Sequence, residues 1–295
     1  MLVLIFSTLA KEATRSLTSQ LKWEYFKLLL YFYQMEFQDK IVWITGASSG
    51  IGKALAIAFS ERGAKVVLSS RREAELKKVA DHCIGETLIL PIDLLEIESF
   101  ENKVQSVLEH FGRIDILVNN GGISQRGLAS ETGIEIDRKL MEINYFGNIA
   151  LTKAVLPTML SQKNGRIVSI SSLSGKFGFF LRSAYAASKF ALVGFYESLR
   201  LEEADNGISV HLVFPGFVKT NISQNALDST GNKHAELDEN QDKGITPEQC
   251  AERILKGINK NKRDIFVGGR EMLSLKIQRW MPNLFHRIIK KQSAT

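Results

Sequence analysis

Cysteine is scarce in this sequence of 295 residues, which contains only Cys83 and Cys250. The two lie far apart, and neither belongs to a Cys-x-x-Cys pair. The sequence therefore offers no disulfide framework and no zinc site, and we expect a protein without a bound metal. Sparse cysteine is typical of a reducing compartment, so we expect this protein in the cytoplasm.

Long apolar runs are also missing. Residues 2–10 and 28–35 are largely apolar, but both are too short for a membrane-spanning helix, which takes about 20 residues. Residues 2–10 also lack the basic flank of a signal peptide. Residues 1–34 precede Met35, and a strand is expected within six residues of that methionine. This extension is either sequence upstream of a wrongly assigned start, or a short anchor or packing helix.

The middle of the chain lacks the basic charge that the total of +6 suggests. Residues 270–295 contain six Lys or Arg and one acidic residue, and residues 1–34 contain four basic and two acidic residues. The excess charge therefore belongs to the two ends. This distribution argues against a nucleic-acid groove in the body of the protein, and we expect no nucleic-acid partner.

Short apolar runs alternate with amphipathic stretches between the two ends. Runs this short and rich in Val and Ile fit strands that are buried on both faces of a parallel sheet. The alternation predicts right-handed strand–helix–strand units. We expect one α/β domain over residues 35–269, a doubly wound (Rossmann) parallel sheet with helices on both faces. Its seven predicted strands are 41–45, 65–70, 87–91, 114–119, 166–171, 209–214 and 264–267.

A glycine-rich loop, T-G-A-S-S-G-I-G at 45–52, follows the first predicted strand and opens a helix. Gly46 permits a tight turn, Gly50 lets backbone approach a phosphate, and Gly52 lets the helix pack on the sheet. The exposed N–H groups and the helix dipole at this position favour an anion. The alternative is a structural turn without a ligand.

The second strand ends in S-S-R-R, without the carboxylate that binds the ribose 2′-hydroxyl of NAD. Arg71 in that place suits a 2′-phosphate, so we expect NADP(H) rather than NAD(H). The alternative is a solvated basic turn. Asp93, after the third strand, is expected to accept a hydrogen bond from an adenine amino group or to cap a helix, and the two roles are not exclusive.

Tyr185 and Lys189 are four residues apart, so on a helix they share a face. A nearby cation favours the phenolate, which lets the phenol exchange a proton with a carbonyl or alcohol oxygen. Ser172 stands at the end of the fifth strand, where its hydroxyl can bond the same substrate oxygen. Tyr-x-x-x-Lys alone is common by chance, but here it follows a glycine loop and a strand-end serine.

Together these motifs resemble the short-chain dehydrogenase/reductase family over roughly residues 36–268. The further motifs that carry the resemblance are N-N-G-G (119–122), N-Y-F-G (144–147) and P-G-F-V-K-T (215–220). The resemblance implies a catalytic tetrad of Asn144, Ser172, Tyr185 and Lys189. The cofactor residues that we expect are Gly46, Ser48, Ser49, Gly50, Ile51, Gly52, Arg71, Asp93, Asn120, Gly122, Tyr185, Lys189, Pro215, Gly216, Val218 and Thr220.

The sequence departs from the family pattern at Gly121, where alanine is usual, which bears on local rigidity near the cofactor. Within the family, N-Y-F-G, R-S-A-Y-A-A-S-K and P-G-F-V-K-T-N-I-S-Q-N-A-L look most like the dehydrogenase/reductase member 7B group. Animal members of that group are membrane-associated reductases. This closer resemblance suggests a relative but no particular substrate.

Three further segments are candidates for binding the substrate or a partner. Polar residues 221–245 are either a substrate lid or a disordered surface loop. Aromatic residues at 177, 179 and 180 line an apolar substrate wall, or pack internally or at a subunit interface. The basic, amphipathic tail 270–295 lies on an anionic membrane, or covers the substrate cleft or a subunit partner.

We therefore expect an NADP(H)-dependent oxidoreductase that interconverts a carbonyl and an alcohol on a small molecule with an apolar part. We also expect a homo-oligomer, a dimer or tetramer. The competing functions are a non-catalytic dinucleotide sensor and a membrane-surface scaffold.

Overall fold

The computed structural model describes residues 36–236 and 238–291, and its centre is a seven-stranded sheet. All strand pairs in this sheet are parallel, in the order β3-β2-β1-β4-β6-β7-β9. The predicted fold class is confirmed, and the predicted strands are correct to within two residues at each end. Their bounds are Ile41–Thr45 for β1, Lys65–Ser69 for β2, Thr87–Ile89 for β3, Ile116–Asn119 for β4, Gly165–Ile170 for β6, Ile208–Pro215 for β7 and Asp264–Val267 for β9.

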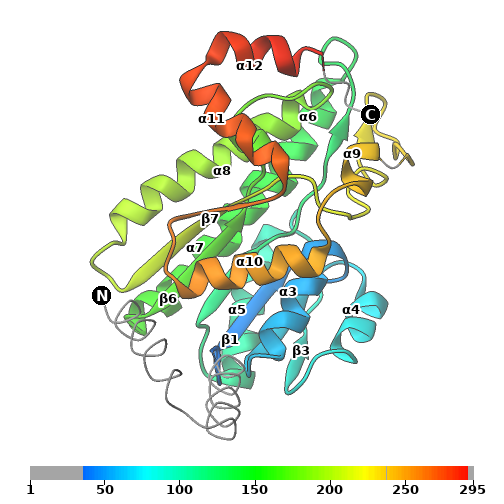
Figure 1. Ribbon diagram of the computed structural model, residues 1–295. Coiled ribbons are helices and arrows are strands. Elements are labelled where there is room, and N and C mark those ends of the chain that lie inside the picture. The colour runs from blue at the N-terminus through cyan, green and yellow to red at the C-terminus, as the bar shows by residue number, and fades with distance from the viewer. Residues whose placement is uncertain (1–35, 237, 292–295) are drawn as a thin grey trace, which may run out of the picture.

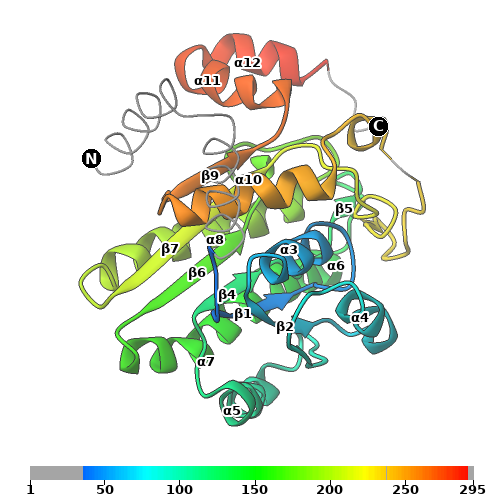
Figure 2. The same cartoon turned by 60° about the horizontal axis from the view of Figure 1, so that its bottom comes forward.

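Helices cover both faces of the sheet, as Figures 1 and 2 show. One face carries α3 (Gly50–Ser60), α4 (Glu73–Ala80) and α10 (Pro247–Asn259), and the other carries α5 (Phe100–Phe111), α7 (Gly147–Ser161) and α8 (Ser183–Glu202). Successive strand residues point to opposite faces, so each strand contributes to two cores.

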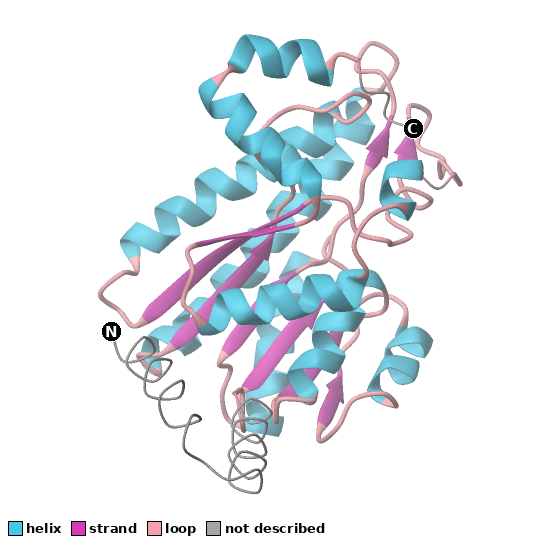
Figure 3. Cartoon of the chain, viewed as in Figure 1, coloured by secondary structure: helices cyan, strands magenta, loops and turns pink. Residues whose placement is uncertain are grey.

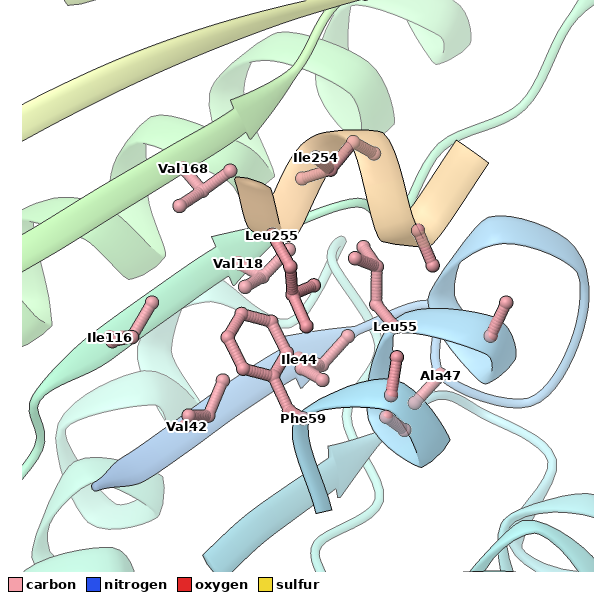
Figure 4. Close-up of a cluster of buried hydrophobic side chains, with 14 of the residues drawn as sticks. Val42, Ile44, Ala47, Leu55, Phe59, Ile116, Val118, Val168, Ile254 and Leu255 are labelled. Atoms are coloured by element: carbon pink, nitrogen blue, oxygen red, sulfur yellow. The ribbon is translucent and has the colours of Figure 1, made fainter. Parts of the chain in front are cut away.

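Strand β1 illustrates this double burial. Val42 and Ile44 face α3 and α10, where Phe59 and Leu255 complete the cluster drawn in Figure 4. Trp43 belongs to the opposite core and is fully buried. Its indole nitrogen donates a hydrogen bond of 2.8 Å to Ser69 on the neighbouring strand, so burying this large ring leaves its one polar atom satisfied.

Strand order reverses between β1 and β4, which is where open α/β sheets bind ligands. A short second sheet of β5 (Gln125–Arg126) and β8 (Leu227–Asp228) is formed by the segments that follow β4 and β7. The other short elements are α6 (Ile134–Met141), α9 (Glu239–Asp242), the π-helical turn η2 (Glu142–Phe146) and the 3₁₀ turns η1 (Ile97–Ser99), η3 (Leu173–Gly175) and η4 (Arg270–Met272).

The described part of the C-terminal tail forms two helices, α11 (Leu273–Trp280) and α12 (Pro282–Ile289), which lie together at the top of Figure 3. Phe285 on α12 packs edge-on against Phe177, with 4.9 Å between ring centres. The tail therefore covers the segment that follows β6. No helix formed by the described residues is long and apolar enough to span a membrane.

The expectations for residues 1–34 lie outside the described residues. Neither the wrongly assigned start nor the short anchor is tested by the structure, and both stay predictions.

Candidate active site

The glycine loop between β1 and α3 has the geometry of a phosphate cradle. Gly46 and Gly50 adopt left-handed backbone angles, with φ of 64° and 55°, which residues with a side chain rarely adopt. A Cβ atom at Gly52 would lie 2.3 Å from the carbonyl oxygen of Gly46, so only glycine fits there. Ser49 stands at the N-cap of α3 without a capping side-chain hydrogen bond. The first N–H groups of α3 therefore remain available for an anion.

Two arginines stand beside this cradle at the end of β2. Arg72 donates hydrogen bonds from Nη2 to the hydroxyls of Ser48 and Ser49, at 2.9 and 3.1 Å. Arg71 is exposed next to it. Arg71 is the residue that the sequence predicts at the 2′-phosphate, whereas Arg72 is the one that contacts the loop in the structure. The S-S-R-R segment contains both residues, and only the geometry shows which of them makes this contact.

Asp93 and Gly121 are two further positions that the sequence relates to the cofactor. The carboxylate of Asp93 accepts a hydrogen bond of 3.1 Å from the backbone of Leu95, so it closes a turn rather than capping a helix. A Cβ at Gly121 would come within 2.8 Å of the Leu94 side chain. That contact is with the end of a flexible side chain, which explains how a small movement accommodates alanine at this position.

Asn144 is held inside the π-helical turn η2, where such turns often mark functional positions. It is completely buried. Its amide accepts from the N–H of Ile123 at 2.8 Å and donates to the Ile123 carbonyl at 2.9 Å. It also donates to Ser188 at 3.0 Å, which ties η2 to α8 one residue before Lys189.

Tyr185 and Lys189 lie on the first two turns of α8, and both are 5 % exposed. The N-terminus of this helix is fixed by Gln125, whose side-chain oxygen accepts from the N–H groups of Ala184 and Tyr185 at 2.9 and 3.3 Å. Lys189 Nζ donates to the carbonyl of Ile170 at 2.9 Å. Burial lowers the pKa of Lys189 to about 8, so its ammonium needs further acceptors to remain charged above that pH.

A cavity joins these groups. Ser172, Tyr185 and Lys189 line it together with Asn120 and Gly122. The segment after β7 forms another part of its wall, with Pro215, Gly216, Val218 and Thr220, and Ile51 of the glycine loop also borders it. Asn144 is not among the lining residues, because it lies behind Gly122, whose Cβ position is 2.9 Å from the Asn144 side-chain oxygen.

The substrate end of the cavity is partly apolar. Leu173, Phe177, Phe179, Ile222 and Ile289 line it. Phe180, in contrast, does not and is 55 % exposed. Loop 221–245 contributes Ile222 and Gln241, and the tail contributes Ser274 and Ile289. In its described part, the loop is packed against the body, because Ser223 and Asp238 are buried.

The family model for "short chain dehydrogenase" matches residues 40–230. This chain belongs to the short-chain dehydrogenase/reductase family. It is therefore an oxidoreductase of a family that uses a nicotinamide dinucleotide, and the glycine cradle fits the pyrophosphate of such a cofactor. Within the described residues, no group of three or more His, Cys, Asp or Glu is placed to hold a metal ion.

Relatives of high sequence identity also belong to this family. The chain is 46% identical over 266 residues to a "Dehydrogenase/reductase SDR family protein 7-like" of Anopheles gambiae, covering 86% of this chain and 83% of the relative. It is 40% identical over 266 residues to "Dehydrogenase/reductase SDR family member 7B" of Rattus norvegicus, covering 87% and 82%. The resemblance to the member 7B group is confirmed.

Solved structures share the fold. A short-chain dehydrogenase/reductase from Burkholderia phymatum in complex with NAD has a TM-score of 0.75 at 23% identity, covering 84% of this chain and 96% of that one. A short-chain dehydrogenase from Streptomyces avermitilis has a TM-score of 0.70 at 28% identity, covering 85% and 99%.

Four polar residues that border or support the cavity were not predicted from the sequence. Gln125 positions the start of α8, Arg182 and Gln241 line the substrate end, and Glu271 accepts from the backbone N–H of Phe217 at 3.1 Å. Arg182 is the first residue of R-S-A-Y-A-A-S-K, a motif that indicated the resemblance but gave this arginine no role. Gln125, Gln241 and Glu271 belong to none of the motifs described above.

Proposed function

We propose that this protein is an NADP(H)-dependent reductase or dehydrogenase that interconverts a carbonyl and a secondary alcohol. The observation that carries the proposal is the placement of Ser172, Tyr185 and Lys189 around one cavity that extends to the glycine cradle. A bound nicotinamide dinucleotide supplies or accepts the hydride in this chemistry. The protein's own residues handle the proton and hold the reactants.

Tyr185 is the proton donor to a carbonyl oxygen, or the acceptor from an alcohol. Its buried position excludes bulk water, and the Lys189 ammonium favours the phenolate that remains after proton donation. Ser172 donates a hydrogen bond to the same substrate oxygen and stabilises its developing charge. Its hydroxyl is oriented because it accepts from the Ser174 N–H at 3.1 Å, which leaves its own O–H available to donate.

Lys189 has a second function at the cofactor ribose, whose hydroxyls supply the acceptors that the buried ammonium needs. Asn144 supports the path by which protons reach the site, from its position between Ile123 and Ser188. Pro215, Gly216, Val218 and Thr220 line the cavity and would hold the nicotinamide end, with Asn120 and Gly122 on the same wall.

A preference for NADP(H) is supported by the charge at the end of β2. Arg71 and Arg72 are both cations beside the cradle, and the S-S-R-R segment contains no carboxylate that would repel a 2′-phosphate. Arg72 already bonds the Ser48 and Ser49 hydroxyls, which keeps its guanidinium against the phosphate loop.

We also propose a peripheral contact of α11 and α12 with an anionic membrane surface. Their outer face exposes Trp280 at 76 %, Leu273 at 58 % and Leu284 at 42 %. Basic side chains lie among them, at positions 276, 279, 287, 290 and 291. This mixture favours the interface of a bilayer with anionic lipids. In this arrangement the protein works in the cytoplasm at a membrane surface.

The decisive experiment is a panel of ketones, aldehydes and secondary alcohols tested with NADPH and NADP⁺, read by the nicotinamide absorbance. The proposal expects turnover of at least one carbonyl–alcohol pair that depends on Tyr185. A protein that binds NADPH tightly but turns over no member of a broad panel would instead support a dinucleotide sensor.

A further inference from the structure

Two arginines share one aspartate beside the catalytic tyrosine. Arg126 donates from Nε to Asp238 at 3.1 Å, and its Nη2 also bonds that carboxylate. Arg182 donates from Nη2 to the same carboxylate at 2.9 Å. All three side chains are buried, with Asp238 at 3 % exposure and Arg182 at 9 %. Two cations therefore face one anion in a place that is nearly free of water.

The two arginines are not equally satisfied. Arg126 also donates from Nη1 to the Ser124 hydroxyl and the Gln125 carbonyl, at 3.2 and 2.7 Å. The Arg182 guanidinium makes hydrogen bonds only to Asp238 among the described residues, and its Nε is buried without a hydrogen-bond partner there. A guanidinium carries five N–H donors, so most of the capacity of Arg182 is unused.

Arg182 lines the same cavity as Tyr185 and Ser172. Its guanidinium carbon lies 5.9 Å from the ring centres of both Tyr185 and Phe179. The backbone at this point is fixed, because Gly127 N–H donates to the Leu181 carbonyl at 3.1 Å and Gly127 pairs with Arg182 in a short bridge. The cation is thus held at the substrate end of the site.

Two further polar atoms without partners belong to side chains that line this cavity. They are the Gln241 side-chain oxygen and the Ser274 hydroxyl, both buried and without a partner among the described residues. Buried polar atoms are normally hydrogen-bonded, and leaving one unpaired costs about 1–3 kcal/mol. Three such atoms around one cavity indicate that polar groups of a ligand complete the site.

The charge of the cavity favours an anion. Burial, and then the neighbouring Arg126 charge, lower the pKa of Arg182 to about 10, so it remains protonated at neutral pH. Glu271 is an acidic residue on the cavity wall, but its carboxylate accepts from the N–H groups of Phe217 and Gly269 at 3.1 and 2.9 Å. These bonds hold the Glu271 carboxylate in place, and its charge is offset by the Lys189 ammonium on the same cavity wall. Asp238 offsets one arginine of the pair, so one positive charge remains.

We propose that the substrate carries a carboxylate in addition to the reacting carbonyl, and that Arg182 binds this carboxylate. The inference rests on the proposed oxidoreductase function and adds the substrate class, an oxo acid or hydroxy acid with an apolar body. A planar guanidinium matches a carboxylate in shape. A single unbalanced charge matches a monoanion rather than a phosphate dianion. The apolar body lies against Phe177 and Phe179.

The test compares each acid with its own methyl ester. The probes are 4-acetylbenzoate and 5-oxo-5-phenylpentanoate with their methyl esters, each reduced with saturating NADPH. The readout is the ratio of kcat/KM for acid over ester. We expect the wild-type protein to prefer at least one acid by roughly tenfold to a hundredfold, the range of a charge-assisted hydrogen bond.

Variants assign the preference to Arg182. In Arg182→Met the acid-over-ester ratio falls to about one, and in Arg182→Lys, which keeps the charge but not the fork, it is restored in part. Arg138→Met, at an exposed arginine on α6, is the matched control and keeps the wild-type ratio. Because the ratio is measured within one protein sample, partial unfolding of a variant does not change it.

The outcomes are separable. The inference is overturned, while the proposed function stands, if the wild-type protein reduces the ketone of each methyl ester as efficiently as that of its acid. It is also overturned if Arg182→Met keeps the preference for the acid. If the wild-type protein reduces neither form of any probe and none of the wider panel, the proposed function itself fails. If Arg182→Lys restores part of the acid-over-ester ratio, the positive charge at this position recognises the substrate carboxylate. If Arg182 served only to hold Asp238 and its loop in place, the ratio would not depend on the residue at position 182.

Discussion

The ammonium of Lys189 lies 5.7 Å from the ring centre of Tyr185, and both side chains are nearly free of solvent. Helix α8 sets this relationship, since residues four apart share one face. Lys189 is oriented by the Ile170 carbonyl at the end of β6. The pair is therefore positioned by the sheet and the helix together, and its chemistry can be tested by changing each member.

Replacing Tyr185 with phenylalanine should reduce kcat by about 10²- to 10⁴-fold, the usual contribution of a general acid or base. NADPH affinity should change little, because the hydroxyl acts in the transition state and contributes little to holding the dinucleotide. Steady-state kinetics and a fluorescence titration with NADPH measure the two effects.

Tyr196→Phe is the matched control on the same helix. The Tyr196 hydroxyl is buried and accepts from Asn119 at 2.9 Å. Its loss should lower the free energy of unfolding by about 1–2 kcal/mol and leave turnover largely intact. A Tyr185→Phe protein with turnover similar to that of Tyr196→Phe would remove Tyr185 from the mechanism.

Lys189 should take up a proton when NADP⁺ binds. Its pKa is lowered by burial to about 8, and ribose hydroxyls that accept hydrogen bonds from the ammonium should raise it. At about pH 8.5 the free protein holds Lys189 partly neutral and the complex holds it charged, so binding consumes up to one proton. Calorimetry in two buffers of different ionisation enthalpy measures this proton as a difference in the apparent binding enthalpy.

The same shift has a consequence for stability with a definite sign. The folded-state pKa of Lys189 is below the unfolded value, so between about pH 8 and pH 10 the unfolded chain binds more protons at this position. The contribution of Lys189 to the free energy of unfolding therefore rises with pH through that window. The Lys189→Met protein should lack both this rise and the buffer-dependent binding enthalpy. A wild-type binding enthalpy that is the same in both buffers would contradict the prediction.

Arg71 and Arg72 should determine the choice of dinucleotide. Changing both to serine should weaken NADPH binding by roughly tenfold to a hundredfold, because charge-assisted bonds to the 2′-phosphate are lost. NADH lacks that phosphate, so its affinity should hardly change. Titration calorimetry with both dinucleotides on the single and double variants gives the contribution of each arginine.

Lys256→Ser removes one positive charge from an exposed position on α10 and serves as the control for net charge. Its NADPH-to-NADH affinity ratio should match that of the wild-type protein. If the double arginine variant also keeps the wild-type ratio, or if the wild-type protein prefers NADH, the assignment of cofactor preference to these residues is wrong.

Local periodicity and motif spacing were sufficient for the sheet and the Tyr–Lys–Ser arrangement. Val and Ile runs mark strands because burial on both faces requires them, and Tyr185 and Lys189 share a face on any helix. The ion-pair cluster was not predictable in this way. Asp238 bonds Arg182 and Arg126 across 56 and 112 positions in the chain, and no spacing rule relates polar residues that far apart.

The packing of the C-terminal tail was also not predictable from the sequence, for a different reason. Its sequence predicts amphipathic helices, but apolar residues occur on more than one face, so the pattern alone does not say which face packs inward. The structure assigns the inner face to Phe285 and Ile289, which contact the segment after β6 and the cavity. Trp280 and Leu284 are left on the outer face.

The last prediction concerns that outer face. Changing Trp280 and Leu284 to serine should weaken binding to vesicles of phosphatidylcholine and phosphatidylserine by about tenfold, because the buried apolar area in the membrane interface is reduced. Binding should also fall with added salt, since basic residues near an anionic surface contribute about 1 kcal/mol each at low ionic strength. Co-sedimentation of the full chain with vesicles measures both effects.

Leu201→Ser is the matched control, since Leu201 is 80 % exposed on α8, outside the tail. It should bind vesicles like the wild-type protein. Phe285→Ala changes the inner face of the tail instead, where it removes the ring contact with Phe177. This variant should bind vesicles like the wild-type protein, but its KM for apolar substrates should rise because the tail packs less tightly beside the cavity. If the outer-face variant binds anionic vesicles as well as Leu201→Ser does, the tail is not the membrane contact. Its exposed Trp280 and Leu284 would then require another partner, because an apolar patch of this kind is unusual on a soluble monomer.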